Sequence, residues 1–313
     1  MKSQAQSPGP CSGRRSGLPP GAGFRVGVLA FLSAGAGLLY SQTPAPDLKQ
    51  RPNSPVLAQR VPRDPRLPTI WVAGDSTAAV GTGETQQGWA VPFADYFDPA
   101  KINVVNRARG GRSSRTFITE GLWDNLIAGV KPGDIVLIQF GHNDAGALND
   151  EPPPPLRARG TLPGLGSETK DIDNVLTKRH EVVHTYGWYM SRMIADAKAK
   201  GARPIVLSLT VRDIWQDGRV ERGPGRYGEW SAALAGEAAV PFIDVTNTVA
   251  DKFERMGRDR VHAFYPKDHT HFNAAGADIH AAAVVSGLAE QRVSPVTGSL
   301  SAKGVAVAAD ATP

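Results

Sequence analysis

Short apolar runs alternate with longer stretches of helical periodicity through most of the chain. Five runs have the length of strands, at 69–73, 102–106, 135–140, 204–209 and 240–244. Helical patterns fill the intervals, at 89–97, 123–129, 185–200, 227–236, 245–256 and 274–290. The third run is apolar at nearly every position, which is typical of a strand covered on both faces. This alternation predicts an α/β domain in which helices cover both faces of a parallel sheet.

The amino-terminal residues show a different pattern. Basic residues end at Arg25, an apolar run occupies 26–39, and small residues suited to a signal peptidase occur at Ala34, Ala36 and Ser41. The run is shorter than the ~20 residues that a membrane span needs. We therefore predict a signal peptide over 1–41, no stable membrane span, and a secreted or periplasmic protein. An uncleaved amino-terminal anchor is the alternative.

Three further segments lack apolar periodicity. Residues 42–67 are rich in Pro, Arg, Gln and Asp and predict a solvated linker, so the folded domain is expected over 68–292. Residues 293–313 are rich in Ala, Ser and Gly and predict a flexible tail. The segment 148–174 contains four consecutive prolines after the third strand. It is either a functional loop over the site or a disordered insertion.

The charge balance narrows the function classes. The formal net charge is +5, but 1–41 holds four basic residues and no acidic one, so the remainder carries +1. A nearly neutral body lacks the basic footprint of a nucleic-acid-binding protein. The single cysteine, Cys11, precedes the apolar run. A mature protein without it has neither a disulfide nor a thiolate for catalysis or zinc binding.

Polar residues and glycines cluster directly after the predicted strands. They are Ser76, Gly111, Asn143 and Arg212. In open parallel sheets, ligands bind beyond the carboxyl ends of the strands. The sequence therefore predicts that these residues border one site.

Ser76 has two candidate partners near the end of the domain, Asp268 and His271. A serine hydroxyl becomes nucleophilic when an imidazole takes its proton and a carboxylate orients that imidazole. If Ser76 opens a helix after the first strand, the helical N–H groups also favour developing negative charge. Taken alone, Ser76 is more typical of a helix N-cap. A metal site is a further interpretation, with the ligands Asp75, Asp268, His269 and His271.

Two more residues fit an oxyanion site. The Asn143 side-chain amide can donate a hydrogen bond to an oxyanion, and Gly111 lets a backbone N–H approach a substrate oxygen. Either residue is also a common turn former. Their occurrence in order with Ser76 and His271, each after a strand, favours the catalytic interpretation.

Four segments resemble the sequence blocks of the SGNH (GDSL-type) hydrolases: Gly74-Asp75-Ser76, the Gly111 region, Gly141-His142-Asn143-Asp144 and Asp268-x-x-His271. The resemblance covers about 68–291. It implies a flavodoxin-like three-layer α/β/α sandwich with a five-stranded parallel sheet. It also implies that Ser76 is the nucleophile and His271 the general base, oriented by Asp268. The implied oxyanion donors are the N–H groups of Ser76 and Gly111 and the Asn143 side chain.

Longer segments are similar to rhamnogalacturonan acetylesterases, at 73–77, 111–115, 140–144 and 265–271. The similarity implies a serine carboxylic-ester hydrolase that removes acetyl groups from pectic or related acetylated polysaccharide or oligosaccharide, without a metal or organic cofactor. A lipid or aryl esterase on the same scaffold, a non-catalytic carbohydrate-binding protein and a metal-dependent phosphoesterase are the alternatives.

Three residues are candidates for substrate contact. Arg112 and Arg115 have guanidinium groups suited to uronate carboxylates. An internal salt bridge is the alternative for both and is favoured for Arg112. Trp215, after the fourth strand, is either a sugar-stacking residue or a residue of the core or a loop anchor.

Overall fold

The computed structural model describes residues 61–81 and 85–310. The signal peptide predicted over 1–41 and most of the predicted linker lie outside the described residues. The end of that linker is bound to the domain. Asp64 exchanges two hydrogen bonds with the side chain of Asn103, at 2.8 and 3.2 Å.

Five parallel strands form the central sheet in the order β2-β1-β3-β6-β9. Their bounds are β1 Thr69–Gly74, β2 Asn103–Asn106, β3 Ile135–Gln139, β6 Arg203–Leu207 and β9 Phe242–Ile243. Each coincides with one of the five predicted runs. The order is that of flavodoxin-like sheets, so the predicted fold is confirmed.

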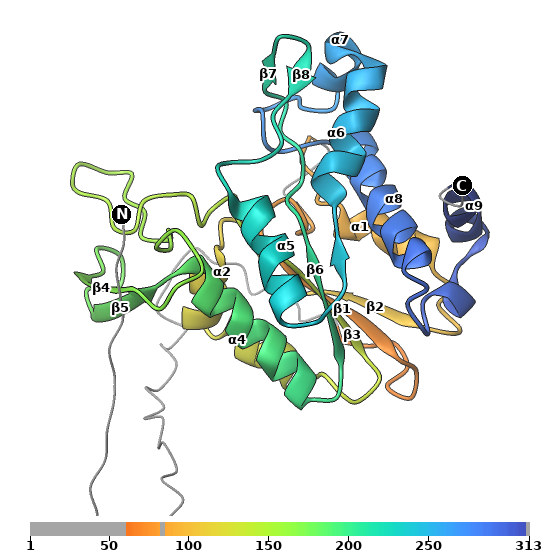
Figure 1. Cartoon of the computed structure of the whole chain (residues 1–313), viewed down its shortest axis with the longest axis horizontal. Helices are drawn as coiled ribbons and strands as arrows, with labels where there is room; N and C mark the ends of the chain where they lie inside the picture. The colour runs from red at the N-terminus through yellow and green to blue at the C-terminus, as the bar shows by residue number, and fades with distance from the viewer. Residues whose placement is uncertain (1–60, 82–84, 311–313) are drawn as a thin grey trace, which may run out of the picture. The chain divides into compact units, whose positions relative to one another are not determined.

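Helices cover both faces of the sheet (Figure 1). Alternate side chains of β1 point to opposite faces, so Val72 joins one apolar core and Trp71 the other. The first core includes residues of α1 Ala90–Phe93, α6 Val245–Met256 and α8 Ala274–Glu290. The second includes residues of α2 Ser114–Thr119, α3 Leu122–Ile127, α4 Tyr186–Ala199 and α5 Tyr227–Glu237. These layers fix the sheet edge from which the site loops leave.

Several short elements have no counterpart in the predicted pattern. They are α2, α7 Arg258–His262, and the hairpins β4 Thr169–Asp173 with β5 His180–His184 and β7 Trp215–Gln216 with β8 Arg219–Val220. The 3-10 helix η2 Ala94–Tyr96, by contrast, lies within the helix predicted over 89–97. The strand β4 reads Thr-Lys-Asp-Ile-Asp and is exposed at four of its five positions. It therefore lacks the apolar alternation by which a strand is recognised.

The carboxyl-terminal segment differs from the predicted flexible tail. Residues 293–310 contain η3 Thr297–Ser299 and α9 Ala302–Asp310. Ser301 donates its backbone N–H to Tyr96 O at 2.9 Å, and a Cβ built on Gly304 would lie 2.2 Å from that oxygen. The small side chains, which suggested a loose tail, instead allow this backbone to pack closely against η2. Within the described residues, no helix is both long and apolar enough to cross a membrane.

Candidate active site

Ser76 lies in a single helical turn directly after β1. Ala79 donates its backbone N–H to Asp75 O at 3.0 Å, but no helix follows within the described residues until Ala90. The helix-like segment considered after the first strand is therefore this one turn and not a full helix. The buried Asp75 carboxylate takes the capping role instead, because it accepts from Thr77 N at 2.8 Å and Thr77 Oγ1 at 2.8 Å. The half-buried Ser76 hydroxyl is left to another partner.

That partner is His271, whose Nε2 lies 2.8 Å from Ser76 Oγ. The other ring nitrogen, Nδ1, lies 2.8 Å from Asp268 Oδ2. With the proton on Nδ1, His271 donates to Asp268 and leaves Nε2 to accept from the serine. The loop between α7 and α8 supplies both residues, while the strand end of β1 supplies the serine.

Asp268 is held ionised by its hydrogen bonds. Its Oδ1 accepts from the backbone N–H groups of Thr270, at 2.7 Å, and His271, at 2.8 Å. Burial by itself raises the pKa of Asp268, but the His271 side chain and these two N–H groups outweigh it, so the pKa lies below its usual value. A carboxylate of this kind stabilises the imidazolium that forms when the histidine takes a proton.

Gly111 and Asn143 border the same position. A Cβ built on the neighbouring Gly110 would lie 3.8 Å from Ser76 Cβ, and Gly111 has a φ of +76°, which favours glycine. The buried Asn143 donates from Nδ2 to Arg112 O at 3.0 Å. An amide carries two N–H groups, so one remains for a substrate oxygen. The structure thus brings the predicted oxyanion residues to the loop that lies against Ser76.

Asp144 joins the loop of Asn143 to the loop that follows Gly111, a role that the sequence motif does not reveal. Its carboxylate accepts from Ser114 N at 3.0 Å and from the Ser114 hydroxyl. Burial raises the pKa of Asp144 to about 7, although the Ser114 hydrogen bonds lower it and the nearby Asp75 raises it further. The strand end that presents Asn143 is therefore fixed to the start of α2.

His142 lies beside the triad as a neutral imidazole. Its Nε2 is 2.9 Å from Thr210 Oγ1. Burial, together with the charges of Arg212 and His271, lowers the pKa of His142 to about 3. His269, in the loop that carries Asp268 and His271, contributes a backbone oxygen, which accepts from Asp213 N at 2.8 Å. Among the described residues, no group of three or more His, Cys, Asp or Glu side chains is arranged to hold a metal ion.

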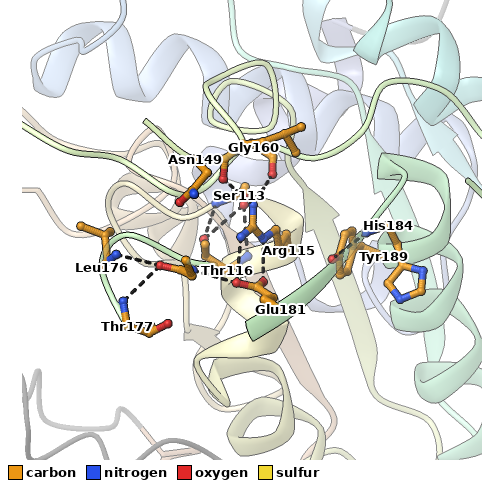
Figure 2. A network of polar contacts seen from close by, with 12 residues as sticks. Ser113, Arg115, Thr116, Asn149, Gly160, Leu176, Thr177, Glu181, His184 and Tyr189 are labelled. Carbon is orange, nitrogen blue, oxygen red and sulfur yellow. Dashed lines mark hydrogen bonds and ion pairs between the residues drawn. The ribbon is translucent and has the colours of Figure 1, made fainter. Parts of the chain in front are cut away.

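The structure contradicts the prediction that Arg115 contacts substrate. Arg115 is fully buried and forms a bidentate ion pair with Glu181 on β5, at 2.7 and 2.8 Å. Its Nη1 donates to Leu148 O at 2.9 Å and Gly160 O at 2.8 Å. Figure 2 shows these contacts converging on the guanidinium. Arg115 thus anchors the 148–174 segment and the β4–β5 hairpin. Arg112 pairs with Glu120 at 2.8 Å, the internal bridge favoured for it.

Trp215 occupies the position of a loop anchor. Its indole N–H donates to Asp213 Oδ1 at 2.8 Å, and its half-buried ring packs against the first core. Asp213 Oδ2 lies 2.6 Å from His262 Nδ1 on α7. The β6–α5 loop is therefore joined to the segment that carries Asp268.

Arg159, from the long segment after β3, reaches the Gly111 turn although no sequence motif singled it out. Its Nη1 donates to Gly111 O at 3.4 Å. The only signal in the sequence was the length of the segment that carries it.

The sequence model of the GDSL-like lipase/acylhydrolase family matches residues 72–279. A rhamnogalacturonan acetylesterase of Emericella nidulans is 35% identical over 227 residues, which are 71% of this chain and 86% of that protein. YesY of Bacillus subtilis, a probable rhamnogalacturonan acetylesterase, is 29% identical over 236 residues, 74% of this chain and 96% of that protein. The solved structure of YxiM from Bacillus subtilis has a TM-score of 0.55 and 25% identity, over 73% of this chain and 58% of that chain.

Ser76, His271 and Asp268 lie in line at the carboxyl edge of a flavodoxin-like sheet, and the family model matches most of the domain. Both observations indicate a serine-hydrolase fold and site. The chain belongs to the GDSL-like lipase/acylhydrolase family. It is a carboxylic-ester hydrolase, which confirms the family and the enzyme class predicted from the sequence.

Proposed function

We propose that the protein is a carbohydrate O-acetylesterase that works through an acetyl-enzyme on Ser76. The observation that carries this proposal is the unbroken line of contacts from Ser76 Oγ to His271 Nε2 and from His271 Nδ1 to Asp268 Oδ2, each 2.8 Å. This is the geometry that a serine nucleophile, its general base and the orienting carboxylate require.

The geometry supports a two-step reaction. Ser76 Oγ attacks the acetyl carbonyl carbon while His271 Nε2 takes its proton. The N–H groups of Ser76 and Gly111 and the free N–H of Asn143 stabilise the tetrahedral oxyanion. His271 then protonates the departing sugar oxygen, and the acetyl group stays on Ser76. Water, deprotonated by the same imidazole, hydrolyses the acetyl-enzyme and releases acetate.

We propose acetylated pectic polysaccharide, of the rhamnogalacturonan type, as the substrate. Two of the relatives support this, since the Emericella nidulans protein is named a rhamnogalacturonan acetylesterase and YesY a probable one. A secreted or periplasmic location, through the segment 1–41, fits a polymeric substrate outside the cytoplasm.

Acetate release tests the proposal. Wild type and Ser76→Ala are incubated with acetylated rhamnogalacturonan, xylan and mannan, and acetate is quantified. Release by wild type that disappears in Ser76→Ala supports the proposal, and the preferred polymer names the substrate. Activity on long-chain or aryl esters alone would move the assignment to a lipid or aryl esterase. Wild-type activity that survives the serine substitution would contradict the proposed mechanism.

A further inference from the structure

Arg159 and Ser76 flank the same pair of glycines. A Cβ built on Gly111 would lie 3.6 Å from Arg159 Nη1, and one built on Gly110 would lie 3.8 Å from Ser76 Cβ. The guanidinium group therefore lies next to the loop that borders the nucleophile. A charge at this place is close to the sugar unit whose ester reacts.

The backbone that carries Arg159 is firmly held. Arg159 N and Gly160 N both donate to Ala147 O, at 3.2 and 2.7 Å. Arg115 Nη1 donates to Gly160 O, as Figure 2 shows. A Cβ on Gly160 would lie 2.0 Å from Gly146 O, so the two segments approach as closely as only glycine permits. Arg159 thus extends from a fixed support rather than from a loose loop.

The charge of Arg159 is not neutralised within the described residues. Arg112 and Arg115 each pair with a glutamate, at 2.8 and 2.7 Å. The side chain of Arg159 makes one hydrogen bond to the described residues, the long one of 3.4 Å from Nη1 to Gly111 O. No described carboxylate forms an ion pair with the guanidinium group, and its buried Nε has no hydrogen-bond partner among the described residues.

Charges of both signs surround the guanidinium group of Arg159 without forming an ion pair with it. Burial lowers the pKa of Arg159, as do the charges of Arg157 and Arg112, while Asp75 and Asp150 raise it. A guanidinium remains protonated at neutral pH despite such shifts. A half-buried, unpaired cation is costly, and an anionic ligand offsets that cost.

We propose that Arg159 is a specificity-determining residue that binds the carboxylate of a uronic acid unit in the acetylated glycan. This inference rests on the proposed acetylesterase function. A guanidinium matches a carboxylate through two parallel hydrogen bonds, which neutral sugars do not offer. Arg159 therefore selects acidic over neutral acetylated glycans. Arg112 and Arg115 do not have this role, because each is paired with a glutamate of the same chain.

The experiment compares Arg159→Gln with wild type on acetylated oligogalacturonide, acetylated xylooligosaccharide and 4-nitrophenyl acetate. We expect kcat/KM for the uronate substrate to fall about tenfold or more relative to the two neutral substrates, mainly through KM. Arg157→Gln is the matched control. Arg157 is exposed and two residues away, and its variant should keep the wild-type preference.

The outcomes distinguish substrate binding by Arg159 from a positioning role, and both from a failure of the proposed function. A loss of the same size on all three substrates, in kcat, would overturn the inference and make Arg159 a positioning residue for the Gly111 turn. An unchanged preference, or a wild-type enzyme that favours xylooligosaccharide, would also overturn it while leaving the acetylesterase function intact. A wild type that releases acetate from no glycan would instead refute the proposed function.

A measurement on wild type alone keeps the test independent of variant folding. Non-acetylated oligogalacturonate should inhibit 4-nitrophenyl acetate hydrolysis more strongly than xylooligosaccharide of equal length, and added salt should weaken that inhibition. Equal inhibition by the two oligosaccharides would overturn the inference.

Discussion

Asp268 contacts His271 through both of its carboxylate oxygens. Oδ1 accepts the His271 backbone N–H at 2.8 Å, and Oδ2 lies 2.8 Å from its Nδ1. The spacing of three residues permits both bonds within one loop turn. The ring is thereby fixed with Nε2 at 2.8 Å from Ser76 Oγ, so the proposed general base is oriented before substrate arrives.

Asp268→Asn should lower kcat by about 10²- to 10⁴-fold with a smaller effect on KM, because an amide N–H opposite Nδ1 favours the wrong imidazole tautomer. Steady-state kinetics on 4-nitrophenyl acetate measure this. Asp259→Asn, at an exposed position on α7, is the matched control and should behave as wild type. Equal kcat in the two variants would show that Asp268 does not orient the base.

Asn143→Ala should lower kcat by about 10²- to 10³-fold, the usual cost of one oxyanion donor. Thermal unfolding of the same variant separates this effect from loss of the contact to Arg112 O. Asn125→Ala, at an exposed position on α3, serves as the control. Full activity of Asn143→Ala would remove this side chain from the oxyanion hole.

Arg115→Met should destabilise the protein by about 3–5 kcal/mol, because it leaves Glu181 without its buried partner. Urea denaturation measures the loss. Arg226→Ala breaks the exposed pair with Glu229 and should cost no more than about 1 kcal/mol. An Arg115 variant with wild-type stability and a raised KM would restore the substrate role that the structure contradicts.

Asp144 should make the free energy of unfolding depend on pH. Its pKa rises from 3.8 to about 7 on folding, so between these values the native state binds a proton that the unfolded state has lost. Stability therefore falls as pH rises through this window, by up to about 4 kcal/mol in total. Urea denaturation at pH 4 and pH 7.5 should show a larger decrease for wild type than for Asp144→Asn, which does not titrate. The same decrease in both would contradict the raised pKa.

The strands and the chemical motifs were predictable because their signals are local. The buried run from Ile135 to Gln139 is apolar at four of its five positions, and the Asp268-x-x-His271 spacing lies within one loop. The family resemblance placed Gly111 and Asn143 in the same neighbourhood without any knowledge of the sheet order.

Contacts between distant residues were not predictable from such patterns. Arg115 finds Glu181 66 positions away, on a hairpin whose polar sequence resembles a loop. Gly304 packs against Tyr96 because α9 lies against η2 in the folded chain. Without that contact in view, the small residues of this segment suggest a flexible tail. Arg159 gains significance only from its place beside Gly111. In each case the deciding partner is brought close by tertiary structure.

Covalent trapping of the nucleophile is the most direct test of the mechanism. Wild type and His271→Ala are treated with a fluorophosphonate, digested and mapped by mass spectrometry. The geometry predicts one modified residue in wild type, Ser76, and modification of His271→Ala slower by orders of magnitude, because no base takes the serine proton. Modification of a different serine, or an unmodified wild type that still hydrolyses acetyl esters, would contradict Ser76 as the nucleophile.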